Sequence, residues 1–397
     1  MVRPGEATHR ASEPGRDEQV RLEPVPLQIW VVVVILSIFW FLLGSRIVPQ
    51  ARQHDFLNLY SGGRLAAQGS FRQIYQPAVQ LETERKLVPG LPELVPFVRP
   101  PFYALALRPL AKIPYRPAFA AWLALQIALY VGVLAWAKSR WGAEALLFGA
   151  MFLPAALGIA SGQDCVVMLA IIAGVMACKD RGRETAAGAV LGLGLIKFHL
   201  FVAWPLVLLV QKRWRMMAGA AVVAAGEIVF SWFLVGTSGL ADYISLLGNQ
   251  GIARLSPSRE LMINVEALTL NLGENSGYLR LLLVLSILGL AILISLRAPF
   301  RSAVIAATTA SVLVSPHVYG YDAALLFPAF CLVLFETRTR LPKLLAVFLC
   351  SPIPYLANLA GFPWRLTTSL CLVFFLLLVA ESREPGIRLP WRRARLA

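Results

Sequence analysis

The stretch LQIWVVVVILSIFWFLLGSRIV, residues 27–48, decides the fold class. It is a continuous apolar run whose single charged residue, Arg46, lies close to its end. About 20 apolar residues are enough for a helix to cross the hydrocarbon core of a bilayer. The run is too long for the apolar region of a secretory signal peptide, and no small-residue cleavage site follows it. We therefore predict a membrane-spanning helix here.

The composition extends this prediction to the whole chain. The 397 residues are 58% hydrophobic, whereas a soluble domain averages about 45–50%. This excludes a soluble enzyme of one or two domains and also a disordered or fibrous chain. The formal net charge is +15, but the basic residues interleave with the apolar runs. We therefore predict the lipid bilayer as a partner and no nucleic acid.

Further apolar runs predict an all-α polytopic membrane protein of about 10–12 transmembrane helices. With the first run they give ten full spans. The predicted transmembrane domain covers residues 27–381, between a disordered tail at 1–26 and a basic tail at 382–397. The other nine runs are Pro117–Ala137, Glu144–Ala160, Gln163–Cys178, Met216–Gly236, Leu279–Leu296, Ser302–Ser315, Gly320–Phe335, Leu344–Asn358 and Leu366–Ala380.

Clusters of Lys and Arg in the short loops predict the orientation. Short loops rich in these residues are cytoplasmic, whereas long loops cross a membrane largely regardless of their charge. We therefore place both termini in the cytoplasm and the long loops Pro49–Arg116 and Thr237–Tyr278 outside. Within the first long loop, Phe102–Ile113 predicts a short interfacial or re-entrant helix. The clusters are Lys138 and Arg140; Lys179, Arg181 and Arg183; Lys212, Arg213 and Arg215; Arg297 and Arg301; and Arg338, Arg340 and Lys343.

One apolar segment breaks the in-and-out alternation. Thr185–Val210 has Lys197 and His199 near its middle and basic clusters at both ends. Two half-helices meeting at Lys197 would keep both clusters on the cytoplasmic side, and non-helical backbone at membrane depth usually lines a cavity. We expect Lys197 at the floor of a cavity open to the outside. The alternative is one long tilted helix whose lysine pairs with a neighbour.

Four separate turns place polar residues on the predicted external side. An Asp after a span is often only a helix cap, and a His in an external turn is often only solvated. Four such turns meeting at one membrane face nevertheless form a candidate active site. Their residues are Asp55 after the first span, Gln163 and Asp164 in the next turn, Lys197 at the break, and His317, Tyr321 and Asp322 in the last turn.

Five short motifs resemble glycosyltransferase family 87. They occur in family order across most of residues 27–380, and two positions differ from the family pattern: Arg99 stands before Pro-Pro where Tyr is usual, and Asp164 stands where Asn or a small polar residue is more frequent. The motifs are residues 54–65 (HDFLNLYSGGRL) with Gly69, Ile74 and Tyr75; residues 99–104 (RPPFYA) with 108–110 (RPL); Ser161-Gly162-Gln163; Gly192–Lys197; and Ser315-Pro316-His317.

The resemblance implies a membrane glycosyltransferase of the GT-C fold. Such an enzyme moves a sugar, with mannose the best guess, from a polyprenyl-phosphate donor to an envelope lipid or glycan acceptor. The implied location is the cell (inner) membrane, with the active site facing the external or periplasmic side. The implied reaction inverts the anomeric centre.

The residues suit this chemistry. A phosphate monoester leaves readily, so the reaction needs one base for the acceptor hydroxyl and cations for the phosphate. Asp55, the one Asp of the first long loop, is the predicted catalytic base. Gln163, Asp164, Tyr321 and Asp322 are possible further site residues. The predicted phosphate-binding residues are Arg64, Arg99, Lys197 and His317.

We predict no cofactor and no metal. Neither long loop contains the Asp-x-Asp pair that clamps a metal in many nucleotide-sugar enzymes, and no His, Cys and carboxylate cluster has zinc spacing. The five cysteines are widely spaced in or beside apolar runs, which indicates small core residues without disulfides.

A transporter or lipid-linked-sugar flippase is the alternative function. Glu227 and Lys197 would then be its intramembrane charges, although a structural hydrogen bond is the more common explanation for an acid such as Glu227. No internal repeat is visible, and the long first loop carries motifs. Transporters often have repeated halves, so these features favour the enzyme.

Overall fold

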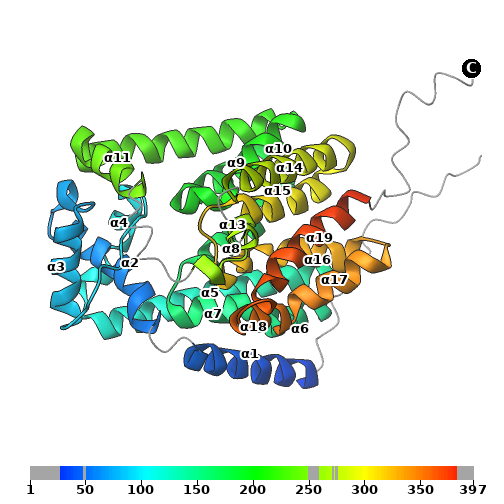
Figure 1. The fold of residues 1–397 in the computed structure, drawn as a ribbon, viewed down its shortest axis with the longest axis horizontal. Helices are drawn as coiled ribbons and strands as arrows, with labels where there is room; N and C mark the ends of the chain where they lie inside the picture. Colours follow the sequence, from blue (N-terminus) through cyan, green and yellow to red (C-terminus); the bar gives the residue numbers. More distant parts are fainter. Residues whose placement is uncertain (1–26, 48–50, 249–258, 271, 273–275, 382–397) are drawn as a thin grey trace, which may run out of the picture.

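The computed structural model describes residues 27–47, 51–248, 259–270, 272 and 276–381. Both predicted tails, 1–26 and 382–397, lie outside these residues. The described part of the chain is helical and contains no strand; its one isolated β-bridge joins Met262 to Tyr319. This confirms the predicted all-α polytopic fold (Figure 1).

The predicted spans form helices, but several are broken. Four described helices are long and apolar enough to cross a membrane: α5 (Tyr115–Trp141), the α9–η3 segment Glu184–Phe201, α11 (Trp214–Gly248) and α14 (Ser276–Arg297). Two bent pairs raise that number to six if each pair is one span. They are α6 (Glu144–Met151) with α7 (Leu153–Ser161), bent by 51°, and α17 (Arg340–Cys350) with α18 (Ile353–Leu359), bent by 55°.

Apart from the first run, the remaining predicted spans form shorter elements. The first run forms α1 (Leu27–Ile47), whose described apolar side chains are largely exposed, as expected of a surface that faces lipid. The shorter elements are α8 (Cys165–Asp180), α10 (Trp204–Val210), α13 (Val265–Thr269), α15 (Phe300–Val314), α16 (Phe327–Glu336) and α19 (Thr367–Glu381), with the 3-10 turns η3 (Leu193–Phe201), η4 (Arg259–Leu261), η5 (Gly320–Leu326) and η6 (Trp364–Leu366).

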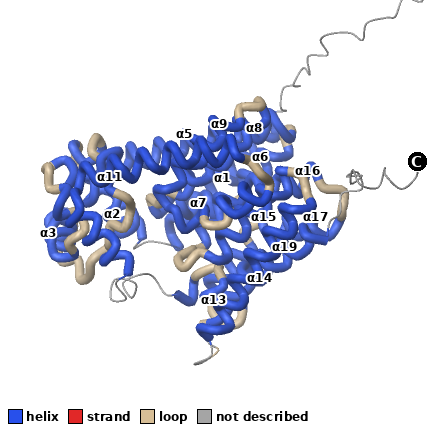
Figure 2. The backbone as a smooth tube through the Cα atoms, turned by 90° about the horizontal axis from the view of Figure 1, so that it is seen from above, coloured by secondary structure: helices blue, strands red, loops and turns tan. Residues whose placement is uncertain are grey.

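The first long loop folds into a small helical cap at one end of the bundle. In Figure 1 its helices α2, α3 and α4 lie together, and both Figure 1 and Figure 2 show α2 and α3 far from α16 and α17. The predicted re-entrant piece forms α4 and η2. The elements of this cap are α2 (Ala51–Ala67), η1 (Phe71–Gln73), α3 (Pro77–Leu87), α4 (Pro101–Leu107) and η2 (Leu110–Lys112).

Close packing holds the cap together. A Cβ on Gly63 would lie 2.9 Å from the Leu107 carbonyl oxygen, so glycine lets α2 approach the end of α4. The Tyr60 hydroxyl donates to the Ile113 carbonyl at 2.7 Å. The buried Glu84 carboxylate accepts from the Val95 amide at 3.0 Å and the Ser61 hydroxyl at 3.4 Å.

The basic loop clusters gather at the opposite end of the bundle. Glu336 accepts hydrogen bonds from Arg140 at 3.1 Å and Arg301 at 2.7 Å, and Arg140 also pairs with Asp180. These residues belong to four loops that the sequence places on one membrane face. The structure therefore brings the predicted cytoplasmic clusters together.

The two ends of the segment Thr185–Val210 lie close together. Its backbone breaks at Lys197, where φ is −130° and ψ is 60°. Glu184, just before the segment, pairs with Lys179 at 2.9 Å and with Arg213, beyond its other end, at 2.8 Å. The two ends therefore meet, and the predicted pair of half-helices is confirmed.

Small residues let α9 (Glu184–Gly192) pack directly on α11. A Cβ on Gly188 would lie 2.0 Å from the Met216 carbonyl oxygen, and one on Gly192 would lie 2.9 Å from the Ala220 carbonyl oxygen. The small-xxx-small spacing of Gly188 and Gly192 therefore serves helix packing, as membrane helices often use it.

Gly188→Ala should lower stability, because a methyl group has no room against the α11 backbone. We expect a loss of about 1–3 kcal/mol, seen as a fall of several degrees in the thermal unfolding midpoint of the detergent-purified protein. The matched control is Gly226→Ala, since a Cβ at Gly226 meets no atom within 4 Å. An equal response of the two variants would contradict this packing.

Candidate functional site

Four charged side chains form one buried network at the cap end of the bundle. Arg99 donates to Asp164 through two bonds, Nε to Oδ2 at 2.8 Å and Nη2 to Oδ1 at 3.1 Å. Lys197 Nζ lies 2.9 Å from Asp164 Oδ1 and 2.9 Å from Asp322 Oδ1. The four side chains are at most 9% exposed. Two cations and two acids balance, which lowers the cost of burying them.

A glycine turn positions Gln163 and Asp164. Gly162 adopts φ +75° at the end of α7, and a Cβ there would lie 2.8 Å from the Phe56 Cβ. Trp122 Nε1 donates to the Gly162 carbonyl at 2.8 Å, and Gln126 Nε2 donates to the Gln163 carbonyl. The buried face of α5 thus fixes the turn that presents both residues.

The turn formed by residues 315–322 is equally fixed. The Tyr319 amide donates to Asp322 Oδ2 at 3.1 Å, which leaves Oδ1 for Lys197. Asn264 Nδ2 donates to the Ser315 carbonyl at 2.7 Å, and the Ile263 amide donates to the Val318 carbonyl at 3.1 Å. A segment of the second long loop therefore supports the carboxylate.

Contacts within the cap and with α11 fix the position of Arg99. The Tyr75 hydroxyl donates to the Arg99 carbonyl at 2.6 Å, and the Phe102 amide donates to Ser231 Oγ on α11 at 3.3 Å. The Tyr75 and Tyr243 rings lie 4.7 Å apart, which adds a second contact with α11. Arg99 therefore connects the cap to the membrane bundle through Asp164.

Asp55 lies beside this network on α2. Its half-buried carboxylate accepts a hydrogen bond from Gln163, whose Nε2 also lies 3.5 Å from the Tyr321 hydroxyl. Burial raises the pKa of Asp55 to about 7, although the Gln163 hydrogen bond and the Lys197 charge lower it. A carboxylate with a pKa near neutrality is suited to accept a proton.

His317 is exposed in the turn that precedes η5. Partial desolvation lowers the pKa of its imidazole; the charge of Asp322 acts against this, and the charges of Lys197 and Arg99 lower the pKa further. Its ring packs edge-on against Tyr319 at 5.0 Å. The role of His317 as a phosphate-binding residue stays a prediction.

Arg64 does not join the other predicted residues. It is exposed in the last turn of α2, nine residues after Asp55. Nine residues at 3.6 per turn place the two side chains on opposite faces of the helix, about 13 Å apart along its axis. The predicted phosphate contact from Arg64 therefore lacks support from the geometry.

Lys197 lies within the buried ion network. Its side chain is 4% exposed and its ammonium pairs with two carboxylates, which agrees with the pairing that the alternative expected. The cavity predicted above Lys197 stays a prediction. Glu227 lies apart on α11, and its Oε2 is buried without a hydrogen-bond partner among the described residues.

The sequence reasoning missed two buried hydroxyls. Tyr103 lies in α4 close to Arg99 and Asp164, and Ser315 precedes His317. Within the described part of the chain neither hydroxyl has a hydrogen-bond partner. Buried polar groups are usually paired, so both are candidates to contact a substrate. Tyr103 belongs to the motif RPPFY, residues 99–103.

No group of three or more His, Cys, Asp or Glu side chains in the described ranges could hold a metal ion. Asp164 uses its carboxylate oxygens on Arg99 and Lys197, and Asp322 uses Oδ1 on Lys197.

Comparison with known proteins identifies the family of this chain. Residues 97–316 match the family model of glycosyltransferase family 87. The chain belongs to this family. It is therefore a membrane glycosyltransferase, and the resemblance of its motifs is confirmed.

One relative of the glycosyltransferase is the polyprenol-phosphate-mannose-dependent alpha-(1-2)-phosphatidylinositol pentamannoside mannosyltransferase of Mycolicibacterium smegmatis. It is 28% identical over 254 residues, which cover 61% of this chain and 58% of the relative. The chain thus matches less than two thirds of that protein's length. No solved structure matches the chain.

The two positions at which the glycosyltransferase departs from its family pattern contact each other. Arg99 and Asp164 are 65 residues apart in sequence and form the two-bond pair described above. A carboxylate without its guanidinium would be a buried, poorly paired charge. Each of these two side chains therefore balances the charge of the other.

Breaking the network should destabilise the glycosyltransferase strongly. Lys197→Met leaves two carboxylates facing one guanidinium, and Asp322→Asn leaves two cations facing one acid. Each single change should cost about 3–5 kcal/mol. The double variant removes one charge of each sign, so it should be more stable than the less stable of the two single variants. Thermal unfolding of the four purified proteins measures this coupling, and strictly additive losses would contradict it.

Proposed function

We propose that the protein transfers mannose from a polyprenyl-phosphate donor to a lipid or glycan acceptor at the external face of the cell membrane. The observation that carries this proposal is Asp55, a half-buried carboxylate with a pKa near neutrality, beside a charge-balanced cluster of Arg99, Lys197 and two acids. The activity of the mycobacterial relative supports the sugar, the polyprenol-phosphate donor and a glycolipid acceptor.

The proposed reaction needs one proton transfer. Asp55 accepts the proton of an acceptor hydroxyl, whose oxygen attacks the anomeric carbon. The bond from that carbon to the phosphate oxygen breaks, and polyprenyl phosphate leaves with the electron pair. Attack opposite the leaving phosphate inverts the anomeric centre. Asp55 ends protonated and then releases the proton to water.

Arg99 and Lys197 are the proposed partners of the leaving phosphate. Asp164 uses two N–H groups of Arg99, and the two acids use two of the three N–H groups of Lys197. A guanidinium has five N–H donors and an ammonium has three, so both cations keep donors for a phosphate oxygen. Negative charge on the phosphate increases as the bond breaks, and fixed donors stabilise that change.

Asp55→Asn should lower sugar transfer by about 10²–10⁴, because the amide keeps the shape of the side chain but accepts no proton. The wild-type rate should rise with pH through about 7 and level off above it, since Asp55 acts only when deprotonated. The measurement is mannose transfer from synthetic polyprenyl-phosphomannose by purified protein in detergent.

The control for the pH profile is Glu84→Gln. Burial raises the pKa of Glu84 to about 7 as well. However, its carboxylate accepts a hydrogen bond from the Val95 amide within the cap and does not belong to the ion network. The Gln variant should keep the rise through pH 7. If that rise disappears in Glu84→Gln, or if Asp55→Asn retains near-wild-type turnover, the base is another residue.

Tyr103→Phe tests the proposed substrate contact. Removal of an unpaired buried hydroxyl should leave the unfolding midpoint unchanged or slightly higher. If the hydroxyl binds the donor, kcat/KM should fall about tenfold. Tyr130→Phe is a contrasting control, because the Tyr130 hydroxyl donates to the Gly149 carbonyl at 2.7 Å and lies outside the site. This control should lose stability. Unchanged transfer kinetics in Tyr103→Phe would exclude the contact.

Cysteine labelling tests the proposed orientation. In a background without native cysteines, a membrane-impermeant maleimide should label Ser70→Cys in intact cells, because residue 70 lies in the cap. Ser139→Cys, which is exposed beside Arg140 at the other end of α5, should react only after permeabilisation. The reverse pattern would place the site on the cytoplasmic side.

A further inference from the structure

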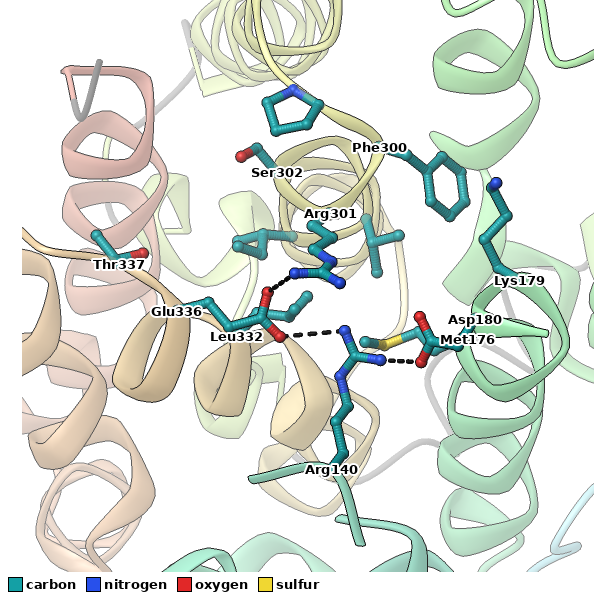
Figure 3. Close-up of a pocket in the computed structure, with 13 residues that line it drawn as sticks. Arg140, Met176, Lys179, Asp180, Phe300, Arg301, Ser302, Leu332, Glu336 and Thr337 are labelled. Atoms are coloured by element: carbon teal, nitrogen blue, oxygen red, sulfur yellow. Dashed lines mark hydrogen bonds and ion pairs between the residues drawn. The ribbon is translucent and has the colours of Figure 1, made fainter. Parts of the chain in front are cut away.

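A pocket of about 520 Å³ opens at the end of the bundle where the basic clusters gather (Figure 3). It lies between the last turns of α5, α8 and α16 and the first turn of α15. Figure 3 shows Glu336 between Arg301 and Arg140, with Phe300 and Lys179 on the neighbouring side. Its volume is within the usual range of small-molecule sites.

This pocket is distinct from the candidate active site. Asp164 precedes α8, and Lys179 and Asp180 end it; Phe300 begins α15, and Ser315 follows it. At 1.5 Å per residue these helices separate the two regions by about 22–24 Å. The pocket and the active site therefore lie at opposite membrane faces.

The charges around the pocket leave one positive charge in excess. Asp180 and Glu336 line it together with three cations, Arg140, Lys179 and Arg301. Including the adjacent pair Glu184 and Arg213 does not change the sum. Arg301 is the cation with the most accessible side chain, 59% exposed despite its bond to Glu336. It is able to turn toward a ligand at little cost.

Other groups at this end also favour an anion. Phe300 and Arg301 begin α15, whose first turn has Pro299 as N-cap residue and no side-chain cap. Free N–H groups at a helix start attract negative charge. Lys179 Nζ and Arg213 Cζ lie 5.7 Å and 5.1 Å from the centre of the Phe300 ring. The cationic groups of Lys179 and Arg213 thus lie together on the Phe300 side of the pocket.

The rest of the pocket wall is apolar. Met176, Leu332, Val304 and Ile305 line it below the charged residues. A free inorganic anion has no apolar part that would contact this wall. A phospholipid does, because its glycerol and first acyl carbons lie next to its phosphate. The position at the ends of apolar helices also fits the depth of a phospholipid headgroup.

We propose that this pocket binds the phosphodiester headgroup of an anionic glycerophospholipid from the leaflet opposite the active site. The single negative charge of the phosphodiester matches the single positive charge in excess. Arg301 and the first amides of α15 contact the phosphate oxygens, and the apolar wall accepts the glycerol end of the chains.

The test is native mass spectrometry of the full-length protein released from detergent with added phosphatidylglycerol. Phosphatidylcholine is the neutral lipid comparison, and inorganic phosphate is the soluble competitor. Arg301→Gln should weaken phosphatidylglycerol binding about tenfold, the loss expected for one charge-assisted contact. Arg340→Gln removes an equal charge at the same end, from a residue outside the pocket, and should weaken it less than twofold.

A second variant keeps every charge. Ser302 lines the pocket and is half-buried, so Ser302→Phe should fill the space and block the lipid. Selective loss in Arg301→Gln and Ser302→Phe supports the proposal. Equal binding by all variants, or equal retention of phosphatidylcholine, would show ordinary boundary lipid and overturn it. Displacement of the lipid by millimolar inorganic phosphate would also overturn it in favour of a soluble ligand.

Discussion

The balance of four buried charges is the constraint on which the rest of the structure depends. In a medium of low dielectric constant, Arg99, Asp164, Lys197 and Asp322 are tolerable only as a complete set with short contacts. Each comes from a different part of the fold: the cap, the turn before α8, the broken segment and the turn of η5. The network therefore fixes these parts relative to one another, and the candidate site inherits that rigidity.

The same balance explains the character of the neighbouring acid. Two unpaired cations next to Asp55 would lower its pKa and make it a poor base at neutral pH. Asp164 and Asp322 cancel most of their field, so burial dominates and the pKa of Asp55 rises to about 7. The acids thus influence the proposed chemistry without contacting a substrate, and they leave N–H donors on both cations for a phosphate.

Part of this arrangement was predictable from the sequence. The Lys and Arg rhythm predicted which loops lie together, and the basic clusters on both sides of Thr185–Val210 predicted the break at Lys197, because charge placement at loops is a local property. Pairing between Arg99 and Asp164 depends on tertiary contacts across 65 residues, which no periodicity encodes. The separation of Arg64 from Asp55 was predictable from the sequence, because helical spacing alone places the two side chains on opposite faces of α2.

The break at Lys197 also has a consequence for biogenesis. During synthesis, Asp164 and Lys197 emerge well before Asp322, which follows the lysine by 125 residues. Until then Lys197 has one acid to share with Arg99, and a lysine at membrane depth costs about 2.5–3.5 kcal/mol on insertion scales. The re-entrant segment thus completes its charge pairing only after the turn of η5 has been translated. The charge balance of this segment is therefore completed late in synthesis.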